Sequence, residues 1–293
     1  MRIRTKTIEG YLFVAPALLY LIFATLYPLI RNVHMSFNEF RGGEWSFVGF
    51  ANFSDLVVDP AFWNSMRASA VFTIASTVFH IVIGLGLALL INGEWFNNRV
   101  RNAVRGLFIV PWVCSTAASA LMWALLMHPF GMLTYLAENV LGLGSIEFFG
   151  SPELAMPSLI AINTWQAYPF YMIAILGGLQ SIPTELYEAA KVDGASGWQR
   201  FTRITLPQLF NILIIVSTVD VITTFSHIDY VRMITRGGPF HVTEVLAYLI
   251  YRTALMDGNV GRGAALGTIM LLILLGFTVV YLRLVGRGNS EDG

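Results

Sequence analysis

The sequence predicts an all-α membrane protein with six transmembrane helices. Of its 293 residues, 56% are hydrophobic and only 12% are charged, whereas a soluble domain has about a quarter of its residues charged. Six apolar stretches approach the roughly 20 residues that a helix needs to cross the hydrocarbon core of a bilayer. Helices are expected because unpaired backbone groups are costly in lipid and because these stretches are much longer than barrel strands.

The six predicted spans form a single membrane domain over residues 1–293. They cover residues 11–30, 68–92, 106–127, 156–180, 208–228 and 265–285. The first is expected to be retained, since no small-residue cleavage site follows it. Residues Val242–Met256 include two charged residues and are too short to span, which predicts an amphipathic helix at the surface or against the bundle.

The charges predict the orientation of the chain. The 18 basic and 18 acidic residues balance, so nothing indicates a nucleic-acid partner. The single cysteine, Cys114, excludes a disulfide framework and a cysteine metal site. Eleven of the 18 basic residues fall at the two ends of the chain and in loops 93–105 and 181–207. By the positive-inside rule, both termini and these two loops are cytoplasmic.

The loop 181–207 is predicted to form a helix–turn–helix. It reads SIPTELYEAAKVDGASGWQRFTRITLP. Pro183 suits the first position of a helix, and Gly194 can end that helix in a left-handed conformation. Ser196 can cap a second short helix, and Pro207 is expected to begin the next span. From the residues alone, an ordinary interfacial loop is equally compatible with this pattern.

The loop resembles the EAA loop of permease subunits of binding-protein-dependent ABC importers. It matches that loop at Glu188-Ala189-Ala190, Asp193-Gly194-Ala195, Phe201, Ile204, Leu206 and Pro207. The turn Gly237-Gly238-Pro239 and the entry Gly261–Ala265 to the last span look like the carbohydrate-importer branch, in particular its maltose-permease-like first subunit. Tyr27-Pro28, Val48-Gly49-Phe50 and Trp165…Pro169-Phe170 look like the same branch, so the resemblance covers nearly the whole chain.

The resemblance implies a type I ABC importer permease fold, with a cytoplasmic coupling helix between helices 4 and 5. It implies a non-enzymatic subunit that forms half of a translocation pathway and works by alternating access. The implied partners are a second homologous permease, two copies of an ABC ATPase, an extracytoplasmic solute-binding protein and a sugar or sugar derivative. The implied location is the bacterial or archaeal plasma membrane. The residues implied to couple to the ATPase are Glu185, Glu188, Ala189, Ala190, Asp193, Gly194 and Ala195.

Nucleotide chemistry is expected on a partner. The sequence has no G-x-x-x-x-G-K-[S/T] phosphate loop, and its only lysines are Lys6 and Lys191. ATP and magnesium are therefore expected to bind the ATPase, with no cofactor in this chain. No catalytic set or cluster of metal ligands stands out from the sequence.

Two predicted spans each carry a polar face. In the fifth, Asp220, Thr223, Thr224 and His227 follow the spacing i, i+3, i+4, i+7, and in the fourth Asn163, Gln166, Ala167 and Phe170 do the same. An acidic residue at a helix centre costs about 2.5–3.5 kcal/mol on insertion scales and usually faces a cavity or a partner. The two faces are therefore predicted to line one substrate pathway. By resemblance, they fall where maltose-type permeases contact substrate, although the acid and the histidine depart from the maltose pattern.

Other interpretations of these residues stay open at this point. Polar groups in membrane bundles often bond neighbouring helices. Asp220 and His227 are also compatible with a proton-coupled secondary transporter, or with the acid–base pair of a membrane-embedded enzyme. His80 is expected to be a lone structural residue, and Gly84 and Gly86 are expected to mark close helix contacts. Residues 31–67 are predicted to form a small packed cap containing several aromatic residues, namely Trp45, Phe47, Phe50 and Phe53.

Overall fold

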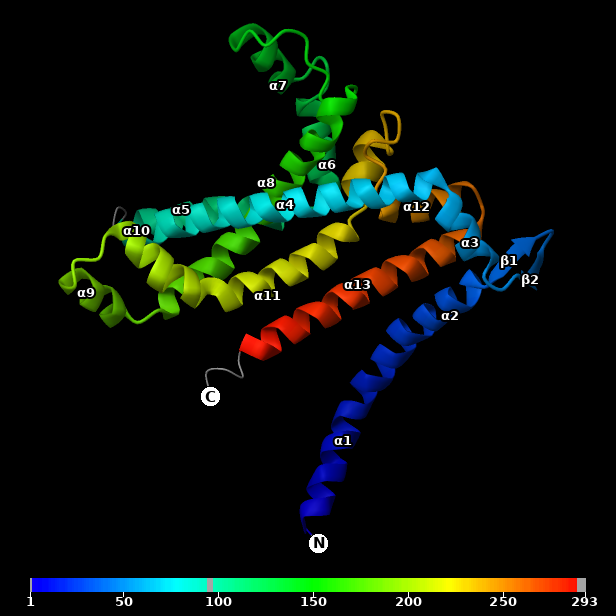
Figure 1. Cartoon of the computed structure of the whole chain (residues 1–293), viewed down its shortest axis with the longest axis horizontal. Coiled ribbons are helices and arrows are strands. Elements are labelled where there is room, and N and C mark those ends of the chain that lie inside the picture. Colours follow the sequence, from blue (N-terminus) through cyan, green and yellow to red (C-terminus); the bar gives the residue numbers. More distant parts are fainter. Residues whose placement is uncertain (1, 94–96, 289–293) are drawn as a thin grey trace. The chain divides into compact units, whose positions relative to one another are not determined.

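A computed structural model describes residues 2–93 and 97–288 (Figure 1). The predicted domain over 1–293 is thus described except at residue 1, residues 94–96 and residues 289–293. The described chain is mostly helical and contains five helices long and apolar enough to cross a membrane, or up to six if one bent pair counts as a span. It divides into two compact units, one built from Met1–Phe62 with Leu249–Ile273, the other from Trp63–Tyr248 with Leu274–Gly293.

The first unit begins with one long apolar helical segment. Helix α1 (Arg2–Leu21) continues through the π-helical turn η1 (Ile22–Leu26) into α2 (Tyr27–Ser36). None of the residues in the apolar window of this segment is buried. An apolar segment without buried side chains is suited to lipid. This agrees with the predicted first span.

The predicted cap contains a hairpin that the sequence pattern did not indicate. Strands β1 (Asn38–Arg41) and β2 (Glu44–Phe47) pair antiparallel, with Phe40 opposite Trp45. Gly42 and Gly43 join them, both with positive φ, as a two-residue hairpin turn requires. Helix α3 (Ala51–Val58) follows. The rings of Phe37, Phe50 and Phe53 pack at centroid distances of 5.3–6.0 Å, so an aromatic cluster does form.

The start of α13 (Val260–Gly288) completes the first unit. Asn32 on α2 donates to the Ala264 carbonyl and to Thr268 Oγ1, both at 3.2 Å. Arg262 forms an ion pair with Asp59, whose side chain also accepts from the Ala61 amide at the beginning of α4. The two long helices that leave this unit are therefore anchored by the same carboxylate.

The second unit is built around three helices that contribute its core. These are α4 (Pro60–Asn92), α8 (Pro152–Ser181) and α11 (Leu206–Phe225). The core is a cluster of buried apolar side chains: Ala88, Ile91, Tyr171, Met172, Ile175, Leu176, Leu179, Ile182, Leu209 and Val216. The remaining elements of this unit are α7 (Met132–Tyr135), η2 (Leu136–Val140), α9 (Thr184–Val192), α10 (Gly197–Arg200), η3 (Phe201–Thr205) and η4 (Val231–Thr235), with α5 and α6 described next.

The segment predicted as one span over 106–127 is broken. It consists of α5 (Asn98–Val113) and α6 (Thr116–Leu126), which are bent by 94° relative to each other. Cys114 and Ser115 between them have extended backbone conformations, which ends the hydrogen-bond ladder of α5. The pair together is apolar enough to cross a membrane, so it can form the span predicted over 106–127, with a bend that was not predicted.

The beginning of the short apolar helix after the fifth span packs on α4. The predicted stretch Val242–Met256 contains α12 (Leu246–Tyr251) and the π-helical turn η5 (Arg252–Met256). Within the second unit, the Leu246 amide donates to Ser69 Oγ of α4 at 2.6 Å. The helix was predicted to lie either at the surface or against the bundle. The structure shows the second, with Leu246 packed against α4.

One of the two glycines predicted to mark a close helix contact does so. A Cβ built on Gly84 would lie 2.5 Å from Tyr171 Cβ and 3.1 Å from the Met172 nitrogen, so α4 and α8 approach closely there. A Cβ on Gly86 would meet nothing within 4 Å, so the prediction that Gly86 marks a close helix contact is wrong. Their different surroundings make the two glycines a matched pair for testing the packing.

We expect Gly84→Ala to destabilise the second unit and Gly86→Ala to leave it unchanged or slightly stabilised. The added methyl at residue 84 must displace the backbone of α8, and overpacking of this kind costs roughly 1–3 kcal/mol. Thermal unfolding of the purified protein in detergent measures the difference. Equal melting temperatures for the two variants would contradict the close contact at Gly84.

Candidate functional site

The two predicted polar faces meet at one cavity in the second unit. The cavity has a volume of about 260 Å³ and is lined by Trp112, Cys114, Thr116, Asn163, Gln166, Ala167, Asp220, Thr223, Thr224 and His227. The α8 and α11 faces are brought together as their spacing predicted, with His227 just beyond the end of α11. The role of these residues in binding a substrate remains a prediction.

Phe170 is the predicted residue that does not line the cavity. Its ring stacks on that of Trp112, at a centroid distance of 5.9 Å and an angle of 23°. Phe170 therefore supports a wall of the cavity, because Trp112 is one of the lining residues. Trp112, Cys114 and Thr116 were not predicted as site residues, since they belong to the break between α5 and α6. Pro111, which removes a backbone donor inside α5, is a sequence signal for that break.

Gln166 ties three parts of the second unit together beside the cavity. Its amide nitrogen donates to the Cys114 carbonyl at 2.9 Å, and its amide oxygen accepts from the Tyr230 hydroxyl. The break after α5 leaves the Cys114 carbonyl without a helical partner, and Gln166 supplies one. Burial raises the pKa of Tyr230, so its hydroxyl keeps the proton that it donates. Gln166 thereby fixes the broken segment against α8 and the chain leading into η4.

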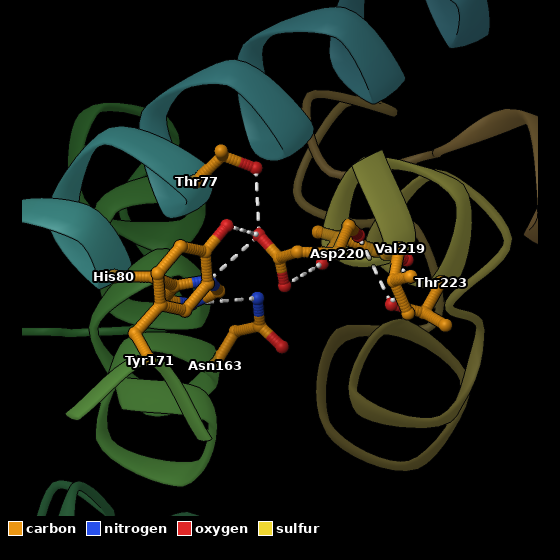
Figure 2. Close-up of polar contacts among 8 residues, drawn as sticks. Thr77, His80, Asn163, Tyr171, Val219, Asp220 and Thr223 are labelled. Atoms are coloured by element: carbon orange, nitrogen blue, oxygen red, sulfur yellow. Dashed lines mark hydrogen bonds and ion pairs between the residues drawn. The ribbon is translucent and has the colours of Figure 1, made fainter. Parts of the chain in front are cut away.

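Asp220 is the centre of a buried hydrogen-bond network (Figure 2). Its Oδ2 accepts from Thr77 Oγ1 at 2.8 Å and from the Tyr171 hydroxyl at 3.1 Å, and it lies 3.0 Å from His80 Nδ1. Its Oδ1 accepts from Thr224 at 3.2 Å. An ionised carboxylate offers about four lone-pair sites. These four contacts occupy most of that capacity, so Asp220 is held by the protein at the edge of the cavity.

His80 is not the lone residue that the sequence suggested. It is fully buried and pairs with Asp220 across 140 positions of sequence. A sequence signal was available, because α4 carries polar residues at helical spacing that all point inward, namely Ser65, Ser69, Thr73, Thr77 and His80. The stripe does not stand out in the sequence, because hydroxyl residues hardly lower the mean hydropathy of a span. It adds a third helix, α4, to the predicted site on α8 and α11.

The structure does not pair Asp220 with His227. Asp220 is bonded to residues of α4, α8 and its own helix, whereas the His227 ring lies 4.9 Å from that of Tyr230. His227 Nε2 is buried without a hydrogen-bond partner among the described residues. The Asp220–His227 proton relay therefore has no support in the geometry. Instead, His227 contributes an unused hydrogen-bonding nitrogen to a residue that lines the cavity.

The loop between α8 and α11 folds into the predicted helix–turn–helix (Figure 1). Helix α9 (Thr184–Val192) ends at a turn where Gly194 has a φ of 76°, in the left-handed region favoured by glycine. The Ala195 amide donates to the Ala190 carbonyl at 2.8 Å, which closes the end of the helix. Ser196 and Gln199 then form a reciprocal capping box at the start of α10 (Gly197–Arg200).

Two details of this loop differ from the sequence expectation. Pro183 is the residue before α9 and not its first residue, because its ψ of 130° is extended. Pro207 does not begin a new helix either. The second short helix runs through η3 (Phe201–Thr205) into α11, so that Gly197–Phe225 is one helical segment of 29 residues. Pro207 fits inside it because the wider π-helical turn η3 precedes it.

The predicted coupling residues lie on the surface of this loop. Glu185, Glu188, Ala189, Asp193 and Gly194 are exposed, and Ala190 and Ala195 are partly buried. Two large apolar side chains beside them are also exposed, Val192 at 89% and Trp198 at 72%. The loop thus presents small, acidic and apolar groups on α9, on the turn that follows it and at the start of α10.

We expect Asp220→Ala to destabilise the protein and Thr223→Ala to be tolerated. Removing the carboxylate leaves buried donors of Thr77, His80 and Tyr171 without their acceptor, at about 1–3 kcal/mol for each group. Thr223 is the matched control, since its hydroxyl bonds only carbonyls of its own helix. Yield from membranes and thermal stability in detergent measure both variants. If Asp220→Ala is as stable as Thr223→Ala, the network does not hold these helices together.

Comparisons with known proteins identify the family. Residues 80–287 match the model of the family described as binding-protein-dependent transport system inner membrane component. The chain is 31% identical to the trehalose/maltose transport system permease protein MalF of Thermococcus litoralis, over 96% of this chain and 95% of that protein. It is 33% identical to the sulfoquinovosyl glycerol transport system permease protein SmoG of Agrobacterium fabrum, over 94% and 89%.

A solved structure is similar over almost the whole chain. It is a bacterial ABC transporter involved in the import of the acidic polysaccharide alginate, with a TM-score of 0.80 and 25% identity over 97% of this chain and 99% of the other. The predicted fold, an all-α permease of the type I ABC importer kind, is thereby confirmed. The chain belongs to the family of binding-protein-dependent transport system inner membrane components and is a multi-pass permease subunit of an ABC importer.

Proposed function

We propose that this permease forms half of a pathway for a sugar or sugar derivative across the plasma membrane of a bacterium or archaeon. The observation that carries the proposal is the cavity between α8, α11 and the α5–α6 break. It is lined by amide, hydroxyl and imidazole groups with an indole ring at its wall. Such groups suit the hydroxyls and the apolar faces of sugars. The names of two relatives, a trehalose/maltose permease and a sulfoquinovosyl glycerol permease, support a sugar as the substrate.

ATP hydrolysis is assigned to a partner subunit in this proposal. The sequence lacks a phosphate loop, so ATP and magnesium bind two copies of an ABC ATPase, and the permease itself is not an enzyme and holds no cofactor. The exposed Val192 and Trp198 support a docking surface on the loop, because exposed apolar groups among polar ones are typical of protein interfaces. By the positive-inside rule, the distribution of the basic residues supports a cytoplasmic location for this loop and both termini, on the side where ATP is available.

Two further partners complete the proposed transporter, a second permease and a solute-binding protein. A second homologous permease supplies the other half of the cavity, and an extracytoplasmic solute-binding protein delivers the sugar. Alternating access then follows from ATP-driven movement of the two coupling loops. A proton-coupled carrier is the rival, but it depends on an Asp220–His227 relay whose two residues are not bonded to each other.

Uptake is expected to require a functional phosphate loop in the partner ATPase. In vesicles containing the complete complex, mutation of the lysine of that loop should abolish sugar uptake, because the permease has no energy source of its own. Dissipating the proton gradient should leave uptake in the wild-type complex unchanged. Uptake that survives the lysine mutation and stops with the proton gradient would establish the rival carrier.

Glu188→Lys should uncouple ATP hydrolysis from uptake while leaving the fold intact. Glu188 is exposed on α9, so the substitution disturbs no packing, but it reverses the charge in the middle of the proposed docking helix. We expect at least a tenfold fall in sugar transported per ATP hydrolysed. Glu188→Gln, which keeps the size and removes only the charge, should have a smaller effect. Normal coupling in Glu188→Lys would remove this helix from the interface.

A further inference from the structure

We propose that His80, which does not line the cavity, sets the hydrogen-bonding groups that the cavity offers to the sugar. It is a positioning residue that acts through Asn163, and this role rests on the proposed sugar transport. His80 lies on α4, while the cavity is formed by α8, α11 and the α5–α6 break. Its imidazole nevertheless contacts two residues of the cavity wall at once, Asp220 and Asn163 (Figure 2).

The two ring nitrogens of His80 have different partners. Nδ1 lies 3.0 Å from Asp220 Oδ2, and Nε2 lies 3.5 Å from the side-chain nitrogen of Asn163. An ionised carboxylate can only accept, so Nδ1 carries a hydrogen. The Asn163 amide nitrogen that faces Nε2 can only donate, so Nε2 is the acceptor of this contact. Asn163 therefore donates from its NH2 group to His80.

This donation determines which end of the Asn163 amide remains for the cavity. With the NH2 group directed at His80, the carbonyl oxygen is the end not used in that contact, and Asn163 belongs to the cavity lining. An amide whose orientation is fixed presents an acceptor, whereas a freely rotating amide presents either end. The fixed oxygen selects sugars with a hydroxyl at the matching position, because that hydroxyl can donate to it.

The His80 ring is itself held in place. Its centroid is 5.8 Å from the Tyr171 ring, and Tyr171 is pressed against Gly84, one turn further along α4. Tyr171 and Thr77 also donate to the same Asp220 oxygen that faces Nδ1. Rotation of the imidazole would break its contacts with both Asp220 and Asn163. The orientation of Asn163 is therefore controlled from α4 by a side chain that the substrate does not touch.

The test uses His80→Asn in the complete, reconstituted transporter. An asparagine amide nitrogen can reach close to the position of Nδ1 and so keep a donor for Asp220, but nothing replaces Nε2. We expect kcat/KM for the transported sugar to fall about threefold to tenfold, the value of one hydrogen bond. Ser76→Ala is the matched control, because Ser76 is buried on the same helix and its hydroxyl has no partner among the described residues.

A selectivity profile separates positioning from a merely structural role. Uptake is compared for the sugar and for its series of monodeoxy analogues. In the wild type and in Ser76→Ala, one analogue should be transported less well than the parent sugar because it lacks the hydroxyl that donates to Asn163. In His80→Asn, this discrimination should decrease threefold to tenfold. Asn163→Ala should also lose this discrimination between the parent sugar and the analogue. The double variant with His80→Asn and Asn163→Ala should lose no more of it than Asn163→Ala alone.

A second variant keeps the proposal testable if His80→Asn does not accumulate. The amide oxygen of His80→Gln can reach the position of Nε2 and accept from Asn163, so the wild-type profile should be retained. An altered profile in a stable His80→Gln, an unchanged profile in His80→Asn or additive losses in the double variant would each overturn the role of His80. Sugar transport by the wild type is scored separately: if the complex carries no sugar, the proposed function fails as well.

Discussion

A buried carboxylate in an apolar bundle is the constraint on which the second unit depends. Asp220 is placed inside a segment destined for lipid, where an unpaired charge is too costly to keep. Its partners come from α4, α8 and its own helix, so satisfying one side chain requires three helices to meet at one height. Gly84 makes that meeting possible, because any side chain there would collide with Tyr171. The position of the cavity follows from this arrangement.

Asp220 and Gln166 have a structural role at the cavity. Both face the cavity, yet the hydrogen bonds of both are largely used within the protein. They support the wall of the cavity, whereas the Asn163 amide oxygen is not used in the contact with His80 and His227 Nε2 has no partner among the described residues. A site assembled in this way is stiff, which favours selection among ligands of similar size by the position of their hydroxyls.

The sequence predicts much of this structure, and the misses have physical reasons. Helical spacing was enough to place Asp220 and Asn163 each on the polar face of its own helix, because residues at i, i+3, i+4 and i+7 share a face in any helix. The meeting of these two faces at one cavity is a contact between helices. The left-handed turn at Gly194 was predicted for the same kind of local reason. The 94° break after Val113 and the His80–Asp220 pair were not predicted. Local signals exist for both, namely Pro111 before the break and the polar stripe of α4 that ends at His80. Their partners, Gln166 for the Cys114 carbonyl and Asp220 for His80, depend on contacts between helices far apart in sequence.

The continuity of Gly197–Phe225 has a mechanical consequence. Because α10 runs through η3 into α11, Asp220 is joined to the α9 turn by one continuous helical segment. A displacement of the α9 turn therefore reaches Asp220 through one helical segment, in which the π-helical turn η3 and Pro207 are the places at which the helix can bend. The contacts of Asp220 with Thr77, His80 and Tyr171 share one carboxylate oxygen, so a movement of Asp220 affects all three together.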